Sequence, residues 1–251
     1  MDAIVAALDQ EQAELDGLLS ALDEPDWAQP SRCEGWTVAD VVLHLAQTNE
    51  LAVESVHGRF AEALDDVAGR LGPGASVDEG ADLMVAAERG APSPELLDRW
   101  RRSADAQRSE FAACEPQQRL VWVTGELSAR TAATTRLAET WIHSGDISAA
   151  FDRVPVPTDR LWHITRLAWR TLPYAFSLSG RELTGPVAFT LDAPSGGTWD
   201  FVPDDEPMTT IRGDAAELCM VAARRAEPQD TGLRGDGPDA GAVLELVRTY
   251  A

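Results

Sequence analysis

The sequence has 251 residues, a hydrophobic content of 44% and a formal net charge of −21. This composition is typical of a globular protein with one large domain or two small ones. The strong negative charge argues against nucleic acid and against anionic membrane surfaces as partners, because both would repel it. The three cysteines show no CxxC spacing, so neither a disulfide framework nor a cysteine-rich zinc site is expected.

No apolar stretch approaches the ~20 residues of a membrane span. The N-terminal segment is acidic from Asp2 onward and lacks the basic region of a signal peptide. We therefore expect a cytoplasmic protein. All 21 basic residues are arginine, and this usage in an alanine-rich sequence indicates a GC-rich genome such as that of an actinobacterium.

Helical patterns dominate the first 155 residues. Apolar residues recur at helical spacing near the N-terminus. Thr37 is suited to cap the second helix, with Asp40 three residues later as in a capping box. Ser93 and Pro94 form a second favourable helix start. The predicted helices cover residues 2–23, 37–57, 94–113 and 128–152; residues 69–93 are expected to be a loop with a short helix around 79–88, and residues 120–129 resemble a hairpin.

The pattern changes in the last hundred residues. Pro155 and Pro157 break the chain, and Thr158 is expected to cap a fifth helix that reaches about residue 176. Alternating apolar residues at 187–191 and 199–201 then predict a β-hairpin. Further elements are predicted as a strand at 208–212, a helix at 214–225, a strand at 231–234 and a helix at 238–249. We thus expect an α+β fold: a four-helix bundle at 1–155, then a linker helix and a small α+β domain at 156–251.

Three side chains of the predicted bundle form a candidate metal site. Glu139 and His143 lie four residues apart, so on a helix they share one face. His44 lies midway along another predicted helix, at a similar depth in the bundle. Bundles build metal sites from inward-facing side chains of facing helices. Two imidazoles and one carboxylate would leave an open coordination position, as in catalytic sites for Zn²⁺ or a similar divalent ion.

Less specific interpretations of these residues remain open. A Glu–His pair at this spacing also occurs on solvated helix faces. A single histidine such as His44, flanked by leucines, is more often a hydrogen-bonded core residue. Asp146 follows on the same face as His143 and could hold the ligating imidazole or act as a base. Cys33 has no histidine near it in the sequence and is interpreted as a packed turn residue.

Two segments resemble the DinB-like, maleylpyruvate isomerase-type family. PSRCEGWTVADVVLHLA is similar to the entry into the helix that bears the family's first histidine ligand, and ETWIHSGDI is similar to its fourth helix. The C-terminal segment that begins at IRGDAAELCM resembles the small domain of actinobacterial members. The resemblance implies that His44, Glu139 and His143 bind a divalent metal, usually zinc, with nickel or iron as other candidates.

The resemblance also implies a chemistry. In the mycothiol-dependent maleylpyruvate isomerase, the ion holds the thiol of mycothiol as the attacking thiolate, and an arginine of the C-terminal domain assists. Arg225 is the nearest match to that arginine and a candidate anion binder, although Arg224 precedes it where the family usually has glycine.

The expected function is a metal-dependent isomerase or S-transferase that uses mycothiol and acts on a small electrophilic metabolite. Two alternatives stay open. One is a hydrolase, lyase or cyclase of a specialised metabolite that activates water or acts as a Lewis acid without a thiol. The other is a non-catalytic metal-dependent binding protein. In each case the partner is a small molecule, and the protein is expected to be a monomer or a homodimer.

Overall fold

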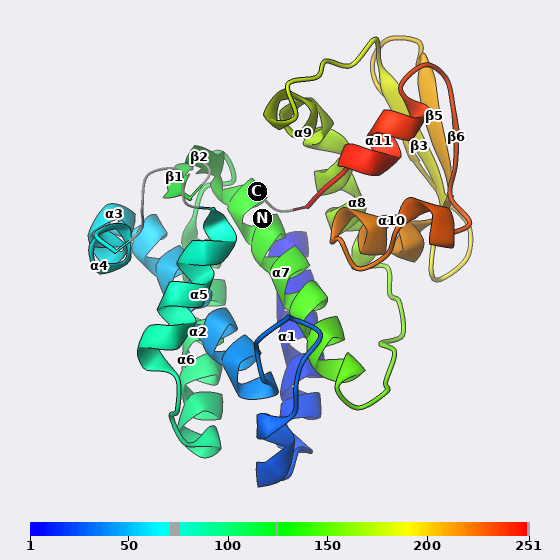
Figure 1. Ribbon diagram of the computed structural model, residues 1–251. Coiled ribbons are helices and arrows are strands. Elements are labelled where there is room, and N and C mark those ends of the chain that lie inside the picture. Colours follow the sequence, from blue (N-terminus) through cyan, green and yellow to red (C-terminus); the bar gives the residue numbers. More distant parts are fainter. Residues whose placement is uncertain (71–75, 124, 250–251) are drawn as a thin grey trace. The chain divides into compact units, whose positions relative to one another are not determined.

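The computed structural model describes residues 1–70, 76–123 and 125–249 (Figure 1). The chain separates into two compact units, Met1–Pro155 and Val156–Tyr250. The first is helical with a small hairpin, and the second combines helices with a four-stranded sheet. This architecture confirms the predicted α+β class. None of the described helices combines the length and the apolar character that crossing a membrane requires.

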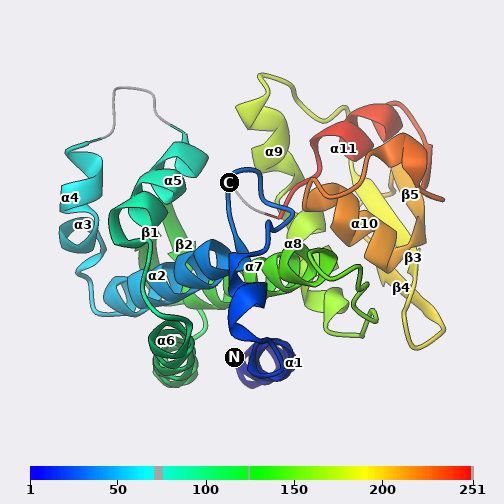
Figure 2. The same ribbon diagram turned by 60° about the horizontal axis from the view of Figure 1, so that its bottom comes forward.

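Four long helices form the bundle of the first unit: α1 (Asp2–Ser20), α2 (Val38–Val56), α6 (Ser93–Ala113) and α7 (Ala129–Ala149). Helix α2 packs against α6 and α7, and α1 packs against the same two helices, so the four close a ring around a shared core. Figure 2 shows α1 and α6 nearly end-on. The predicted four-helix bundle is therefore confirmed, with element ends displaced by a few residues.

Helix α2 begins as the sequence predicts. The Thr37 hydroxyl accepts from the backbone N–H of Asp40, and the Asp40 carboxylate accepts from the backbone N–H of Thr37 at 2.9 Å. This capping box fixes the first turn of the helix. Val41, Val42 and Leu45 are at most 1% exposed. Their burial fixes the orientation of α2 about its own axis. His44, which lies between them in the sequence, therefore faces the interior of the bundle.

Shorter elements complete the first unit. They are the 3₁₀ helix η1 (Glu24–Ala28), the helices α3 (Phe60–Ala63), α4 (Asp65–Ala68) and α5 (Val77–Glu88), and the strands β1 (Arg119–Trp122) and β2 (Gly125–Ser128). Ser76 caps α5 in a second capping box with Glu79. The strands β1 and β2 pair antiparallel, which agrees with the predicted hairpin. Helix α5 packs against α2.

The second unit is built on a sheet with strand order β4-β3-β5-β6. Strands β3 and β4 pair antiparallel as the predicted hairpin, β5 lies parallel to β3, and β6 pairs antiparallel with β5. Apolar side chains of the strands and helices, including Phe176, Phe189 and Val221, form its core. The elements are α8 (Leu161–Arg170), α9 (Leu172–Leu178), β3 (Val187–Asp192), β4 (Thr198–Phe201), β5 (Thr209–Asp214), α10 (Ala215–Ala222), η2 (Pro228–Asp230), β6 (Arg234–Asp236) and α11 (Ala240–Leu246).

The predicted fifth helix is wrong in two respects. It begins at Leu161 after Arg160 rather than after Thr158, and no side chain caps it. It also divides at Thr171 into α8 and α9. Pro173 explains the division, because a proline has no N–H to continue the hydrogen-bond ladder and fits only in a first turn.

Candidate functional site

Helices α2 and α7 bring His44, Glu139 and His143 together inside the first unit. The Nε2 atoms of His44 and His143 lie 3.8 and 3.5 Å from Oε2 of Glu139. The two imidazole rings are 5.0 Å apart between centroids and nearly perpendicular. One ligand atom from each residue lies within 4.8 Å of the other two. Two stretches far apart in the sequence thus meet at one point.

These separations suit a divalent cation. Nitrogen and oxygen ligands of zinc lie about 2.0–2.2 Å from the ion, so their mutual distances in a tetrahedral site are about 3.3–3.6 Å. The observed 3.5 and 3.8 Å require only small side-chain movements. The same distances are long for direct hydrogen bonds. The spacing of these atoms therefore suits shared coordination of a cation better than direct hydrogen bonding between the side chains.

The site is largely withdrawn from solvent. His44 and His143 are 9% and 8% exposed, and Glu139 is half-buried. Helix α7 also buries several other polar side chains, among them Thr140 and Ser144. A helix whose only role is packing would bury mainly apolar side chains on its inner face. The polar inner face of α7 therefore indicates function.

Burial and contacts perturb the ionisation of all three groups. Burial disfavours charge on His143, but its contacts with Asp146, Cys33 and Glu139 outweigh burial and raise the pKa of His143 well above its usual value. Burial likewise favours the neutral acid of Glu139, yet the two histidines and the charge of Arg136 hold its pKa well below the usual range. Without a metal, the pair is thus imidazolium and carboxylate, and a cation must displace the proton of His143.

His44 behaves in the opposite way. Burial lowers the pKa of His44 more than the neighbouring carboxylate of Glu139 raises it. The ring of Trp36 lies 5.0 Å from the imidazole of His44 and is tilted against it by 51°. His44 is therefore a neutral imidazole at pH 7, which is the form that binds metals.

Asp146 holds the second nitrogen of His143. Its Oδ2 atom lies 3.0 Å from Nδ1 of His143, and the residue is only 1% exposed. A carboxylate on the far nitrogen of a histidine is a common partner of metal-ligating histidines. This contact places Asp146 beside the imidazole rather than among the three ligand atoms. Its participation in a reaction stays a prediction.

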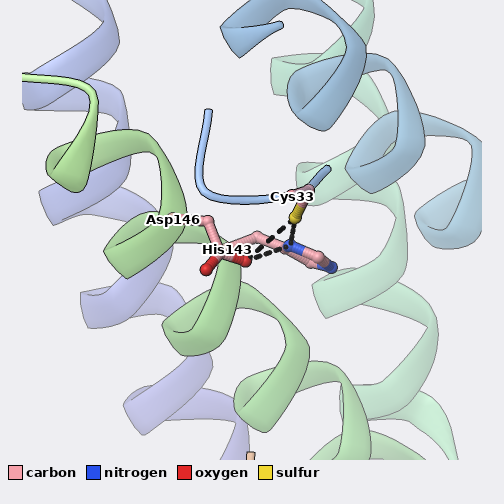
Figure 3. Close-up of side chains that lie close together, drawn as sticks. All are labelled: Cys33, His143 and Asp146. Carbon is pink, nitrogen blue, oxygen red and sulfur yellow. Dashed lines mark hydrogen bonds and ion pairs between the residues drawn. The ribbon is translucent and has the colours of Figure 1, made fainter. Parts of the chain in front are cut away.

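Cys33 lies in the same cluster, which its sequence context did not indicate. Its Sγ atom is 3.2 Å from Oδ2 of Asp146 and 3.7 Å from Nδ1 of His143 (Figure 3). The interpretation of Cys33 as a turn residue without a histidine beside it is therefore wrong about its surroundings. The neighbours come from α7, more than a hundred residues later, so only the tertiary fold reveals them.

Arg136 is a second residue that the sequence analysis missed. It is 2% exposed, its Nη2 donates to Thr48 Oγ1 at 2.7 Å, and its guanidinium lies 5.8 Å from the centre of the Trp122 ring. Its Nε has no hydrogen-bond partner in the described part of the chain. Arg136 precedes Glu139 by three residues and His143 by seven, so helical spacing alone could have placed it on this face.

Arg225 lies in the second unit, just after α10, and is half-buried. Its Nη1 donates to the backbone oxygen of Ala223 at 3.0 Å. Arg224 is exposed, adopts a positive φ of 58° and donates to the backbone oxygen of Glu245. The proposed roles of the two arginines in anion binding stay predictions.

Two known proteins are similar in sequence to this chain over nearly its whole length. It is 33% identical over 253 residues to two proteins of Mycobacterium tuberculosis, "Uncharacterized protein MT0041" and "Uncharacterized protein Rv0036c". Each alignment covers 98% of this chain and 95% of the relative. These relatives are of nearly the same length as the present chain.

Solved structures share the fold. The crystal structure of the mycothiol-dependent maleylpyruvate isomerase superposes with a TM-score of 0.61 at 18% sequence identity and covers 95% of both chains. A histidine-to-alanine mutant of that enzyme gives a TM-score of 0.60 with the same identity and coverage. The family described as "Mycothiol maleylpyruvate isomerase N-terminal domain" matches residues 8–148, which include all of the bundle's candidate ligands. The chain therefore belongs to the mycothiol maleylpyruvate isomerase N-terminal domain family.

Proposed function

We propose that this protein is a divalent-metal-dependent enzyme that uses mycothiol, or a closely similar small thiol, to isomerise or conjugate a small electrophilic metabolite. His44, Glu139 and His143 would hold the ion, with zinc as the first candidate. The observation that carries the proposal is the convergence of three ligand atoms from α2 and α7 within 4.8 Å.

Three protein ligands suit a catalytic site better than a structural one. Zinc takes four ligands in structural sites, whereas catalytic sites use three and leave one position for a water or a substrate. In the described residues, the second group of metal-ligating type includes Cys33 and Asp146, which lie on the Nδ1 side of His143. Cys33 and Asp146 therefore supply no ligand to an ion bound at Nε2 of His143, and one coordination position would stay free for an exogenous molecule.

The proposed chemistry needs a thiolate at neutral pH. A free thiol has a pKa of about 8.5, and a bound dication lowers it far enough to hold the thiolate. The chain's own groups would prepare this event. Glu139 is held as the carboxylate and His44 as the neutral base, while Asp146 accepts a hydrogen bond from Nδ1 of His143 and leaves Nε2 free to bind the ion.

Charge also supports a thiolate ligand. With a dication bound, the carboxylates of half-buried Glu139 and buried Asp146 and the buried guanidinium of Arg136 leave the centre with a net positive charge. A monoanion in the free position would neutralise that charge inside a region of low polarity. A thiolate is such a monoanion. The local positive charge would favour its binding even though the protein as a whole has a net charge of −21.

Titration of the metal-loaded protein with mycothiol tests the proposal. The Cys33→Ser variant is the suitable background, because it removes the chain's own thiol near the centre. With cobalt as the probe ion, we expect a sulfur-to-metal charge-transfer band that grows with mycothiol and saturates. Metal-free protein and the Glu139→Gln variant serve as controls.

Two results would overturn the proposal. The first is a failure of zinc, cobalt, nickel or iron to bind at one ion per chain. The second is a metal-loaded protein that leaves mycothiol unbound, which would point instead to water activation or to a binding function without a thiol.

A further inference from the structure

The chain between η1 and α2 forms a closed turn, Ser31–Trp36. The Ser31 hydroxyl and backbone N–H both donate to the backbone oxygen of Trp36, at 2.8 and 2.9 Å. The N–H of Trp36 donates in turn to the oxygen of Cys33 at 3.0 Å, and the N–H of Cys33 donates to Ser31 Oγ at 3.1 Å. These hydrogen bonds within six residues make the turn a defined element of structure.

Asp146 of α7 accepts hydrogen bonds from both the backbone and a side chain of this turn. The N–H of Arg32 donates to the backbone oxygen of Asp146, and the thiol of Cys33 donates to its Oδ2 atom, each at 3.2 Å. Figure 3 shows the thiol and the imidazole of His143 converging on that carboxylate. Asp146 is 1% exposed, so its oxygens depend on protein donors rather than on solvent.

The same turn also reaches the other histidine. Trp36, its last residue, packs its ring 5.0 Å from the ring of His44. The next residue, Thr37, caps α2, on which His44 lies two turns further along. The Ser31–Trp36 turn thus contacts both candidate metal-binding imidazoles. Trp36 packs on His44, and Cys33 lies against His143 and its partner Asp146.

Cys33 could in principle be a ligand itself, because its Sγ and one atom each of His143 and Asp146 also lie within 4.8 Å of one another. A neutral imidazole, however, offers only one lone pair to an ion. When Nε2 of His143 faces His44 and Glu139, its Nδ1 carries the proton and donates to Asp146. Cys33 then lies on the hydrogen-bonding side of the ring, away from the ion.

We propose that Cys33 is a positioning residue of the metal centre, whose thiol donates to Asp146 and so fixes the carboxylate that orients His143. The inference rests on the proposed function and assigns to it a residue that binds neither metal nor substrate. Loss of the donor removes one hydrogen bond from Oδ2 of the buried carboxylate, the same oxygen that contacts Nδ1 of His143, and it weakens the attachment of the turn to α7. The imidazole is then held less firmly, which weakens metal binding.

Three variants test this role. Cys33→Ala removes the donor, and Cys33→Ser keeps a hydroxyl donor at a shorter reach. Cys114→Ala is the matched control, because Cys114 is buried in the same unit at the end of α6. Zinc affinity is measured by competition with a chelator, and the visible spectrum of the cobalt-loaded protein reports the geometry of the site.

We expect Cys33→Ala to lose about tenfold in zinc affinity, within the range known for partners of ligating residues. Its cobalt bands are expected to shift, while Cys114→Ala keeps both the affinity and the spectrum of the wild type. Cys33→Ser is expected to lie between the two. Wild-type affinity and spectrum in Cys33→Ala would overturn the proposal, as would equal losses in Cys33→Ala and Cys114→Ala. A sulfur-to-cobalt charge-transfer band that Cys33→Ser removes would show that Cys33 is a ligand instead.

A measurement without metal separates this inference from the proposed function. The amide of Arg32 donates to Asp146, so its hydrogen exchange reports whether the turn is docked on α7. In metal-free protein, we expect faster exchange at Arg32 in Cys33→Ala than in the wild type or Cys114→Ala. If the wild type bound no metal, the proposed function would fail, and unchanged exchange at Arg32 would then overturn the role of Cys33 as well.

Discussion

The first unit contains two buried polar clusters of opposite character. One is a chain of neutral amides and a hydroxyl between α1, α2 and α6. Gln12 donates to Gln107 at 3.3 Å, Gln107 to Asn49 at 2.9 Å, and Asn49 to Ser103 at 3.3 Å. The other is the proposed metal centre between α2 and α7, where Oε2 of Glu139 lies 3.8 and 3.5 Å from the Nε2 atoms of His44 and His143.

The difference suggests separate roles for the two clusters: packing for the amides and the proposed function for the ionisable groups. The members of the amide network are themselves uncharged and bond one another at hydrogen-bond distances, with the Arg108 guanidinium also donating to Oε1 of Gln12. The network can therefore specify how the helices pack. In the proposed metal centre the candidate ligand atoms lie farther apart than hydrogen-bond distance, and the pKa values of Glu139 and His143 move far from their usual ranges. Groups that perturb one another in this way are more typical of functional sites.

The sharpest separation of the two clusters comes from His143→Ala. We expect this variant to lose more than about 100-fold in metal affinity, because it removes one of three ligands and leaves Asp146 without its imidazole. The helices should persist, since neither the capping boxes nor the apolar core changes. Elemental analysis and circular dichroism measure the two effects. His57→Ala is the control, because His57 pairs with Glu110 away from the centre; unchanged metal content in His143→Ala would refute the ligand assignment.

The reverse test removes a member of the amide network. Gln107→Leu leaves buried polar groups of Gln12 and Asn49 without a partner, at a cost of about 1–3 kcal/mol for each unsatisfied group. We expect the free energy of unfolding to fall by about 2–3 kcal/mol in urea titrations of the metal-free protein. Metal affinity should stay within about twofold of the wild type, and a large loss would show that the two clusters are coupled.

Acidity should distinguish the clusters without any mutation. Because the pKa of His143 is raised well above 6.5, metal must compete with a proton, and affinity should fall about tenfold for each pH unit below that pKa. In the metal-free fold the same shift stabilises the protein below pH ~6.5, and this contribution is lost as the pH rises through the raised pKa. Zinc titrations between pH 5.5 and 7.5 measure the slope; a flat profile would contradict it.

The smallest expected effect concerns Arg136. Replacing it with methionine removes the positive charge that lies one turn before Glu139, so an anion in the free position is held less firmly. We expect the affinity of the cobalt-loaded protein for azide or a thiolate to fall roughly threefold. Arg130→Met, an exposed change on the same helix, is the control. Equal anion affinity in the two variants would show that Arg136 serves packing alone.

Sequence signals of short range identified much of the fold and the three candidate ligands. The Thr37–Asp40 capping box located the start of α2, and the spacing of Glu139 and His143 placed both on one face of α7. The break at Thr171 could not be located as well, because helical periodicity continues across it and the effect of Pro173 was not recognised.

Contacts made by the tertiary fold were harder to predict. The position of Cys33 against Asp146 depends on how the Ser31–Trp36 turn packs on α7, and no local pattern encodes that contact. The parallel pairing of β5 with β3 was equally hard to predict, because the alternation of apolar residues identifies a strand but not the strand that it pairs with. A helical wheel places Arg136 on the same face as Glu139, but its burial could not be predicted. Arginine is seldom fully buried unless it pairs with a carboxylate, and among the described residues none lies at ion-pair distance from Arg136.

The ligand set has a consequence for biosynthesis. About a hundred residues separate His44 from Glu139 and His143, and no shorter stretch of the unit supplies all three groups. A nascent chain therefore has no complete set of ligands until α7 has left the ribosome. The ion would join a nearly finished bundle rather than guide its early collapse, and its binding energy would protect the completed unit from unfolding.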